Sequence, residues 1–298
     1  MEKIDLDRLV TEKRNKATMD LDKLSIHQAA IIMNKEDQKV AIAVKEALPW
    51  IEIAINKVVA SFQNGGRLIY IGAGTSGRLE VLDAAECVPT FGVEPEMVTG
   101  LIAGGQKALT VAVEGAEDDA DQGIEDLKRS ELSKNDTVIG IAASGRTPYV
   151  TGALEYAKKV GAGTVALSLN KDSVIGKLAD TKIEVDVGPE FLTGSTRLKS
   201  GTAQKMVLNM ISTISMIRIG KVYKNLMVDV KPTNGKLIER AKHIIMEATD
   251  STYQTASEKF KEADNDVKTA IVMILTDCDK KTAKQKILKA HGFVRKTL

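Results

Sequence analysis

The sequence predicts an α/β protein built on a five-stranded, doubly wound parallel sheet, with an N-terminal helical arm and a small C-terminal helical domain. Five short β-type runs alternate with helical or glycine-rich segments, which is the pattern of parallel strands joined by right-handed crossovers. Several of these runs are apolar throughout, as strands covered on both faces are. No such run follows residue 232, so the remainder is expected to be helical.

The arm is expected to cover 1–36, where cap-type residues precede short apolar stretches. One long helix is expected over 37–62, because apolar residues recur there at helical spacing and 64–66, Asn-Gly-Gly, can end it. The expected strands are 67–71, 97–102, 137–141, 164–168 and 182–187, and the helices between the later strands are 118–130, 147–160 and 171–179.

The segment 195–219 is predicted to form a long helix that is apolar around much of its circumference. Such a helix is normally buried in a core or in a subunit interface. Residues 234–298 predict three or four short helices without strands. The expected domains are therefore the arm at 1–36, the sheet domain at 37–230 and the helical domain at 231–298.

Charge and composition exclude several classes of protein. The 42 lysines and arginines nearly balance the 40 aspartates and glutamates, whereas nucleic-acid-binding proteins usually carry a strong basic excess. Cys87 and Cys278, the two cysteines, make neither a disulfide framework nor a zinc motif. Residues 1–16 lack the apolar core of a signal peptide, and no run of about 18 apolar residues could span a membrane. A cytoplasmic protein without nucleic-acid or membrane partners is expected.

The glycine-rich loop 72–78, which follows the first predicted strand and opens a helix, is the most informative segment. Ligands bind beyond the carboxyl ends of strands in open parallel sheets, and the amides at a helix start attract anions. The candidate phosphate-binding residues here are Gly74, Thr75, Ser76, Gly77 and Arg78. A tight turn without a ligand is the alternative. The glycine spacing matches a dinucleotide fingerprint, but no ribose-binding acid follows, and no nucleotide P-loop is present.

A second loop has the same character. Ser144, Gly145, Arg146 and Thr147 follow a strand and precede Pro148, which suits the first turn of a helix. Two Ser-Gly-Arg loops at the same end of one sheet can converge on one ligand. Together they predict a pocket for a phosphate with hydroxyl groups nearby.

Two glutamates are candidates for acid–base catalysis. Glu86 lies on the helix after the first loop, among small and apolar neighbours that could raise its pKa. An ordinary helix glutamate is the alternative, and residue context alone favours it. Glu117 belongs to an acidic cluster at 114–119, where acids can also simply offset the dipole of the following helix.

The segment 188–200 is rich in hydroxyl groups. Thr193, Ser195 and Lys199 could reach a ligand, or Ser195 or Thr196 could simply cap the following helix. No histidine, aspartate or glutamate cluster has metal-ligand spacing, and no serine nucleophile elbow is present. No metal, no cofactor and no serine-triad chemistry are therefore expected.

These motifs jointly resemble the N-acetylmuramic acid 6-phosphate etherase family. The resemblance starts at the Thr-Glu-Lys-Arg-Asn run of 11–15, covers nearly the whole chain, and is very specific over 194–209. It rests on 72–78 (Gly-Ala-Gly-Thr-Ser-Gly-Arg), 83–86 (Asp-Ala-Ala-Glu), 89–92 (Pro-Thr-Phe-Gly), 115–118 (Gly-Ala-Glu-Asp), 143–148 (Ala-Ser-Gly-Arg-Thr-Pro) and the run 192–209. The general class, the sugar isomerase (SIS) domain, is similar in its two serine-bearing loops.

The resemblance implies cleavage of the lactyl ether of N-acetylmuramic acid 6-phosphate, giving N-acetylglucosamine 6-phosphate and D-lactate in cell-wall sugar recycling. Opening of the sugar ring would expose an aldehyde that acidifies the C2 hydrogen; a base removes it, lactate leaves C3, and water adds. Glu86 would protonate the departing oxygen and activate water, and Glu117 would take the C2 proton. Phosphate and sugar hydroxyls would be held by Thr75, Ser76, Ser144, Arg146 and Thr147.

The resemblance also implies a homodimer with the sugar site near the subunit interface, and Glu80 in the first helix is expected to be a neutral difference. Two other functions remain open from the sequence. One is a phosphosugar aldose–ketose isomerase on the same kind of domain, and the other is a non-catalytic sugar-phosphate sensor.

Overall fold

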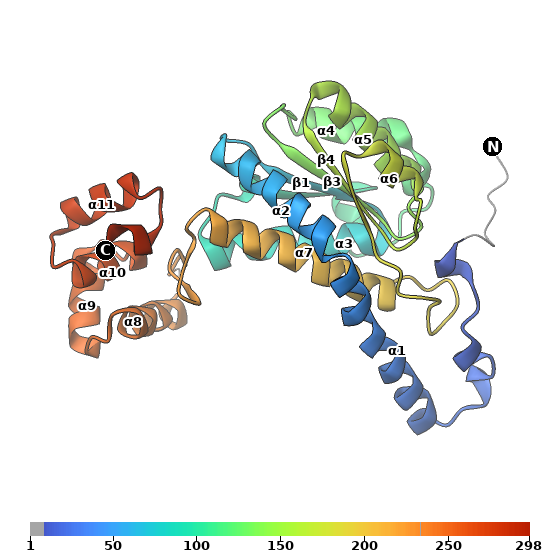
Figure 1. Ribbon diagram of the computed structural model, residues 1–298, viewed down its shortest axis with the longest axis horizontal. Coiled ribbons are helices and arrows are strands. Elements are labelled where there is room, and N and C mark those ends of the chain that lie inside the picture. Colours follow the sequence, from blue (N-terminus) through green and yellow to red (C-terminus); the bar gives the residue numbers. More distant parts are fainter. Residues whose placement is uncertain (1–8, 233) are drawn as a thin grey trace. The chain divides into compact units, whose positions relative to one another are not determined.

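The computed structural model describes residues 9–232 and 234–298 (Figure 1), so the first eight residues of the predicted arm lie outside the described residues. The chain divides into two compact units. The first comprises Met1–Ala84 and Glu96–Ile211, and the second comprises Ala85–Pro95 and Ser212–Leu298. The domain boundaries expected from the sequence, at 1–36, 37–230 and 231–298, remain a prediction.

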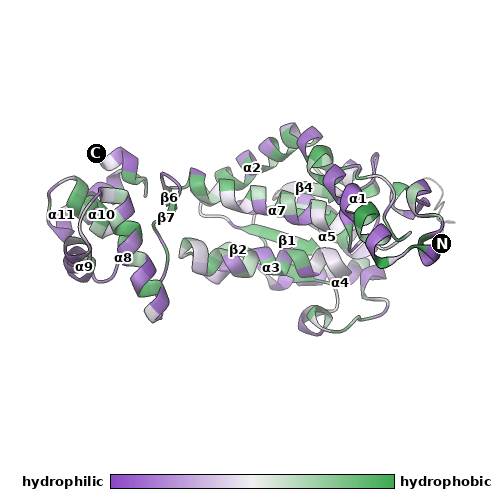
Figure 2. Ribbon diagram, turned by 90° about the horizontal axis from the view of Figure 1, so that it is seen from below, coloured by the Kyte–Doolittle hydropathy of each residue, from purple (hydrophilic) through white to green (hydrophobic). Residues whose placement is uncertain are grey.

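The first unit is built on a five-stranded sheet of order β2-β1-β3-β4-β5, in which every neighbouring pair is parallel. Helices lie on both sides of this sheet (Figure 2), and every residue of β1 and β3 is buried. The predicted parallel α/β architecture is thus confirmed. The strands are β1 (Leu68–Gly72), β2 (Val98–Ile102), β3 (Thr137–Ala142), β4 (Gly163–Ser168) and β5 (Thr181–Glu184).

The helix predicted over 37–62 is wrong in its extent, because two helices occupy this part of the chain. Helix α1 (Ile26–Glu46) begins earlier, at a capping box between Ser25 and Gln28. Helix α2 (Leu48–Gln63) carries Pro49 in its first turn. A proline there has no N–H to donate backwards, so the helical hydrogen bonding is interrupted after Glu46 although the apolar spacing continues.

The helices predicted at 118–130, 147–160 and 171–179 are confirmed, with ends that shift by a few residues. They are α4 (Ala120–Arg129), α5 (Pro148–Val160) and α6 (Val174–Leu178). The glycine-rich loop opens α3 (Gly74–Phe91), and the predicted helix 195–219 is α7 (Lys199–Arg218). Short 3₁₀ segments are found at Val10–Glu12, Lys16–Thr18, Leu21–Lys23, Pro95–Met97, Gly105–Leu109, Ala116–Asp118 and Val294–Thr297.

The start of α7 is capped differently from the prediction. The carboxylate of Glu190, which is fully buried, accepts hydrogen bonds from the backbone N–H groups of Lys199 and Ser200, each at 2.9 Å. Because the helix begins only at Lys199, neither Ser195 nor Thr196 is its N-cap. An acid placed there also offsets the positive end of the helix dipole.

The second unit contains the antiparallel pair β6 (Val222–Tyr223) and β7 (Leu226–Met227), followed by the helices predicted for 234–298. These are α8 (Gly235–Thr249), α9 (Tyr253–Glu262), α10 (Val267–Leu275) and α11 (Lys280–Lys289), and α10 is the most buried of them. Each has a side-chain N-cap, provided by Asn234, Thr252, Asp266 and Asp279. Among all the described helices, none is long and apolar enough to cross a membrane.

Candidate functional site

The two predicted loops leave adjacent strands at the same edge of the sheet. Strands β1 and β3 pair in parallel with Gly72 opposite Ile141, so the chain continues from both into neighbouring loops. This is the carboxyl edge of the strands, where open α/β sheets bind their ligands. The loops 72–78 and 144–147 therefore begin side by side in the first unit, as binding of one ligand by both would require.

The first loop forms one wall of a small cavity of about 200 Å³. The opposite wall is the segment 103–117, which ends in the acidic cluster. Glu117 and Glu114 therefore share this cavity with Gly74 and Arg78. The remaining lining residues are small or apolar: Ala73, Ala103, Ala108, Ala112, Val113, Gly115 and Ala116.

Arg78 is held in place by the same opposite wall. Its Nε donates a hydrogen bond to the carbonyl oxygen of Leu109 at 3.1 Å. A guanidinium group has five N–H donors, so the other four nitrogen-bound hydrogens remain for a ligand or for solvent. A cation and the carboxylate of Glu117 thus line one cavity at a helix start.

The second loop needs a glycine at its centre. Gly145 has φ +74°, and a Cβ there would lie 2.5 Å from Cβ of Ser173. Thr147 is the N-cap residue of α5 but makes no side-chain capping bond, and Pro148 is in the first turn, as predicted. Within the described residues, Nη1 of Arg146 is buried without a hydrogen-bond partner. A buried cationic donor without a partner favours an anion as its missing partner.

The hydroxyl of Ser76 makes hydrogen bonds inside the protein, to the side chain of Gln204. Ser76 is buried, its Oγ lies 3.2 Å from Oε1 of Gln204, and Nε2 of Gln204 donates to the same Oγ at 3.0 Å. These bonds tie α3 to α7 rather than reach into the cavity. Thr75, by contrast, is half-buried and its methyl group faces Gly201.

Glu86 is exposed on α3, in the part of that helix that belongs to the second unit. It is not among the residues that line the cavity of Gly74 and Glu117. The structure thus brings Glu117 together with the first loop, and it describes Glu86 as an accessible carboxylate.

Thr193 lies elsewhere, in an open depression of about 390 Å³ formed with the N-terminal arm. The arm itself is fixed by specific bonds: Nδ2 of Asn15 donates to the carbonyl of Pro189 at 3.3 Å, and Oδ1 of Asn170 accepts from the N–H of Val10 at 2.7 Å. Ser195 is half-buried and lines neither this depression nor the cavity of Glu117.

Lys199 has a structural partner. Its side chain is buried, and Nζ donates to Oε2 of Glu36 at 2.8 Å and to the carbonyl of Val187 at 2.9 Å. Burial raises the pKa of Glu36, but hydrogen bonds from Lys199 and Lys39 lower it more, to about 2. These contacts favour a role in holding α7 to α1 over a role in ligand binding.

We expect Lys199→Met to lower the free energy of unfolding by about 3–5 kcal/mol, because it leaves the buried carboxylate of Glu36 without its main partner. Lys39→Met is the matched control: Lys39 bonds the same carboxylate but is largely exposed, so a loss of about 1 kcal/mol or less is expected. Since the pKa of folded Glu36 is depressed, its contribution is complete above the ordinary glutamate pKa and is lost as pH falls towards about 2. Urea unfolding at several pH values measures both effects, and equal losses in the two variants would contradict the assignment.

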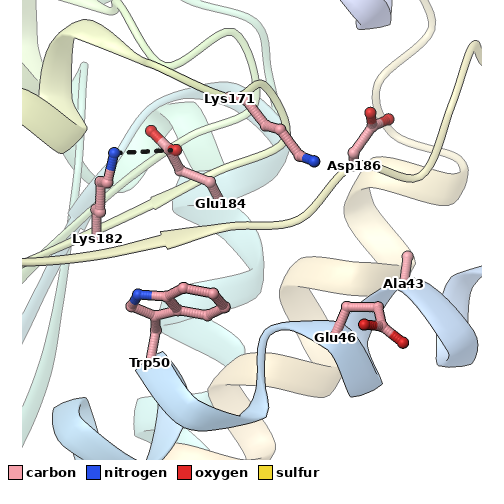
Figure 3. A pocket seen from close by; sticks show the side chains of 7 residues that line it. All are labelled: Ala43, Glu46, Trp50, Lys171, Lys182, Glu184 and Asp186. Atoms are coloured by element: carbon pink, nitrogen blue, oxygen red, sulfur yellow. Dashed lines mark ion pairs between the residues drawn. The ribbon is translucent and has the colours of Figure 1, made fainter.

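A larger hollow of about 590 Å³ lies between the α1–α2 region and the end of β5 (Figure 3). Trp50 forms one wall, and Lys182 and Glu184 face it with Nζ and Oε2 3.6 Å apart. Glu184 also accepts from the N–H groups of Asp172 and Ser173, so its carboxylate is already committed. No residue that the sequence predicted for the site lines this hollow. Size alone does not make it the functional site.

Glu80 was expected to be a sequence difference without consequence, but its environment on α3 is unusual for an acid. It is fully buried on α3, neither carboxylate oxygen has a hydrogen-bond partner within the described residues, and burial raises its pKa well above the ordinary value. The sequence did contain a signal for this burial. Gly77, Glu80 and Ala84 are spaced by three and four residues, which puts Glu80 on the face of α3 that packs inwards.

The parallel α/β fold is that of the SIS-domain class of proteins, which two family models match. The SIS domain family model matches residues 112–214, and the model of the glucokinase regulatory protein N-terminal SIS domain matches residues 51–158. Among solved structures, a putative sugar-phosphate isomerase from Listeria monocytogenes is 18% identical and covers 65% of this chain and 92% of its own, with a TM-score of 0.47.

Full-length relatives define the family more closely. The chain is 64% identical over 295 residues to N-acetylmuramic acid 6-phosphate etherase 2 of Enterococcus faecalis, covering 99% of this chain and 100% of that protein. It is 65% identical over 295 residues to N-acetylmuramic acid 6-phosphate etherase of Lactococcus lactis subsp. lactis, covering 99% of each. The chain therefore belongs to the N-acetylmuramic acid 6-phosphate etherase family.

Proposed function

We propose that this protein is a carbon–oxygen lyase that removes D-lactate from N-acetylmuramic acid 6-phosphate. The observation that carries the proposal is identity of 60–65% along essentially the whole chain to relatives that are named as this etherase. The products are N-acetylglucosamine 6-phosphate and D-lactate, and the step belongs to the recycling of cell-wall amino sugars. Neither a metal nor a cofactor takes part in the scheme.

The chemistry proceeds by elimination and addition, because an alkoxide is a poor leaving group for direct displacement. The open-chain aldehyde at C1 acidifies the hydrogen on C2. A base takes that proton, the C3–O bond breaks with its electron pair on the lactate oxygen, and that oxygen gains a proton. Water then adds across the C2–C3 double bond, with its oxygen on C3 and a proton on C2.

Two carboxylates take the proton-transfer roles in the proposal. Glu117 removes the C2 proton, which is supported by its place in the cavity beside Gly74 and Arg78. Glu86 protonates the departing lactate oxygen and then activates water, which is supported by its accessibility and by the family's pattern. Each glutamate would return to its starting protonation state at the end of one turnover.

The phosphate site is proposed at the shared edge of the two loops. The amides at the start of α3, the guanidinium of Arg78 and the buried, unpaired Nη1 of Arg146 favour an anion there. The hydroxyls of Thr75, Ser144 and Thr147 complete the set of polar groups, and Thr147 is not used for capping. Gly77, Gly145 and Ser76 serve this site by shaping the loops.

We further propose a homodimer in the cytoplasm. The support for the dimer is a group of exposed apolar side chains on α1 and α2 of the first unit, which a second copy could cover. These residues are Ile31, Ile42, Leu48, Trp50 and Ile53. The support for the compartment is the phosphorylated sugar in the name of the relatives, since the step uses an amino-sugar phosphate.

Turnover of N-acetylmuramic acid 6-phosphate in ¹⁸O-labelled water tests the function and the scheme together. We expect release of unlabelled D-lactate and one ¹⁸O atom at C3 of N-acetylglucosamine 6-phosphate, because the ether oxygen leaves with lactate. Enzymatic lactate assay and mass spectrometry measure the two products. Label in the lactate would refute elimination, and ketose formation without lactate release would favour the isomerase.

A further inference from the structure

Glu80 occupies the space between the two loops of the proposed phosphate site. A Cβ on Gly72 would lie 2.9 Å from Oε2 of Glu80, 3.0 Å from the carbonyl oxygen of Ile141 and 3.3 Å from the nitrogen of Gly77. Gly72 ends β1 and starts the first loop, whereas Ile141 lies near the end of β3, just before the second loop. The carboxyl group of Glu80 therefore fills a gap that only a glycine at position 72 leaves open.

The surroundings of this carboxyl group disfavour a charge. Glu80 has no exposed surface, and neither oxygen makes a hydrogen bond of acceptable geometry in the part of the chain that is described. Burial raises its pKa, and the N–H of Gly72 opposes the rise by a smaller amount. An ionised carboxylate without a paired cation in such a place would be costly, so the neutral acid is the stable form.

Among the described residues, no cation compensates a charge on Glu80. Burial raises the pKa of Tyr149 on α5, the hydrogen bond to Asp126 adds to the rise, and a negative charge on Glu80 would add to it further. Asp126 on α4 accepts from the hydroxyl of Tyr149 at 2.6 Å. On the helix of Glu80 itself, the Nε of Arg78 donates to Leu109 and its guanidinium lines the cavity. The strand residues Gly72 and Ile141 carry no charge.

We propose that Glu80 is a positioning residue that holds the two loops together as an uncharged carboxylic acid, so that loss of its proton weakens binding of the substrate's phosphate. Oε2 of Glu80 and the carbonyl oxygen of Ile141 lie 2.9 and 3.0 Å from the same point beside Gly72, so a carboxylate would repel that carbonyl oxygen more than the neutral acid does. A negative charge directly behind the first loop would also oppose the phosphate that the loop binds. The inference rests on the proposed phosphate site.

Binding of N-acetylglucosamine 6-phosphate to the full chain, measured by calorimetry between about pH 7.5 and 9.5, tests the inference. A phosphate monoester loses its second proton near pH 6, so the charge of this probe is constant over the range. For the wild type we expect the Kd to rise by more than about twofold over this range, since binding that requires a proton weakens as that proton is lost. For Glu80→Gln, which is uncharged at every pH, a Kd constant within about twofold is expected. A wild-type Kd as constant as that of the uncharged variants would overturn the inference.

Controls separate this effect from general alkaline damage. Glu52→Gln, an exposed glutamate on α2, should follow the wild type. Glu80→Leu provides a second uncharged side chain in case the glutamine amide disturbs folding, and it should also remove the pH dependence. Parallel loss of affinity in the wild type and in the uncharged variants would overturn the inference while leaving the phosphate site intact. No binding by the wild type at pH 7.5 would overturn the phosphate site, and the inference with it.

Discussion

Glu117→Gln is expected to lower the rate of D-lactate release by about 10²- to 10⁴-fold, the range that a positioned general base contributes. Glutamine has the same shape but cannot accept the C2 proton. The side chain lines the cavity of Gly74 and Arg78, so its replacement should leave the phosphate-binding loops in place. The loss should therefore appear in kcat rather than in KM.

Glu114→Gln is the matched control for this prediction. Both glutamates line the same cavity, and they are three residues apart in the same acidic cluster. If Glu117 is the base, Glu114→Gln keeps most of the activity, and exchange of the C2 hydrogen with D₂O stops only in Glu117→Gln. Loss of exchange in Glu114→Gln, with exchange intact in Glu117→Gln, would reassign the base to Glu114.

Glu86→Gln is expected to fold normally and to lose lactate release by a similar factor, about 10² or more, because the departing oxygen no longer receives a proton. The side chain is exposed, so little stability depends on it. Exchange of the C2 hydrogen with D₂O should persist, since Glu117 is unchanged. The two variants would then separate the two proton transfers.

A substrate with a better leaving group checks the role of Glu86 directly. With a 4-nitrophenyl ether at C3 in place of the lactyl ether, the departing oxygen needs no proton. Glu86→Gln should therefore recover most of the wild-type rate of 4-nitrophenolate release in the first turnover, before water adds. Glu94→Gln removes an exposed acid that pairs with exposed Lys231 at 3.1 Å; it is the control and should be unaffected with either substrate. A fully active Glu86→Gln with the natural substrate would remove Glu86 from the mechanism.

Much of the fold follows from local sequence patterns. The continuous apolar runs predicted five buried strands and a parallel sheet, because strands covered on both faces need apolar residues on both. Helix α5 was predicted closely, since Pro148 marks its first turn. The break between α1 and α2 was missed because the apolar spacing continues past Pro49.

The two candidate loops could also be located from the sequence alone. Their glycines and hydroxyls follow strands, and Gly145 has the positive φ that such a turn requires. Glu117 was only one of several acids in its cluster until the structure showed that the segment 103–117 folds back onto the loop of Gly74. Family resemblance, not residue context, singled it out in the sequence.

By itself, the sequence thus determined the family, the order of strands and helices, and the two loops at the ligand edge. Only the tertiary structure decided which polar side chains meet. Glu190 caps α7 from nine residues before its first residue, and Lys199 pairs with Glu36, 163 positions away. Glu80 is buried next to Gly72. The physical reason is that local patterns depend on backbone preference and on spacing along one element. The charge and partner of a buried side chain depend instead on the surfaces that distant segments bring against it.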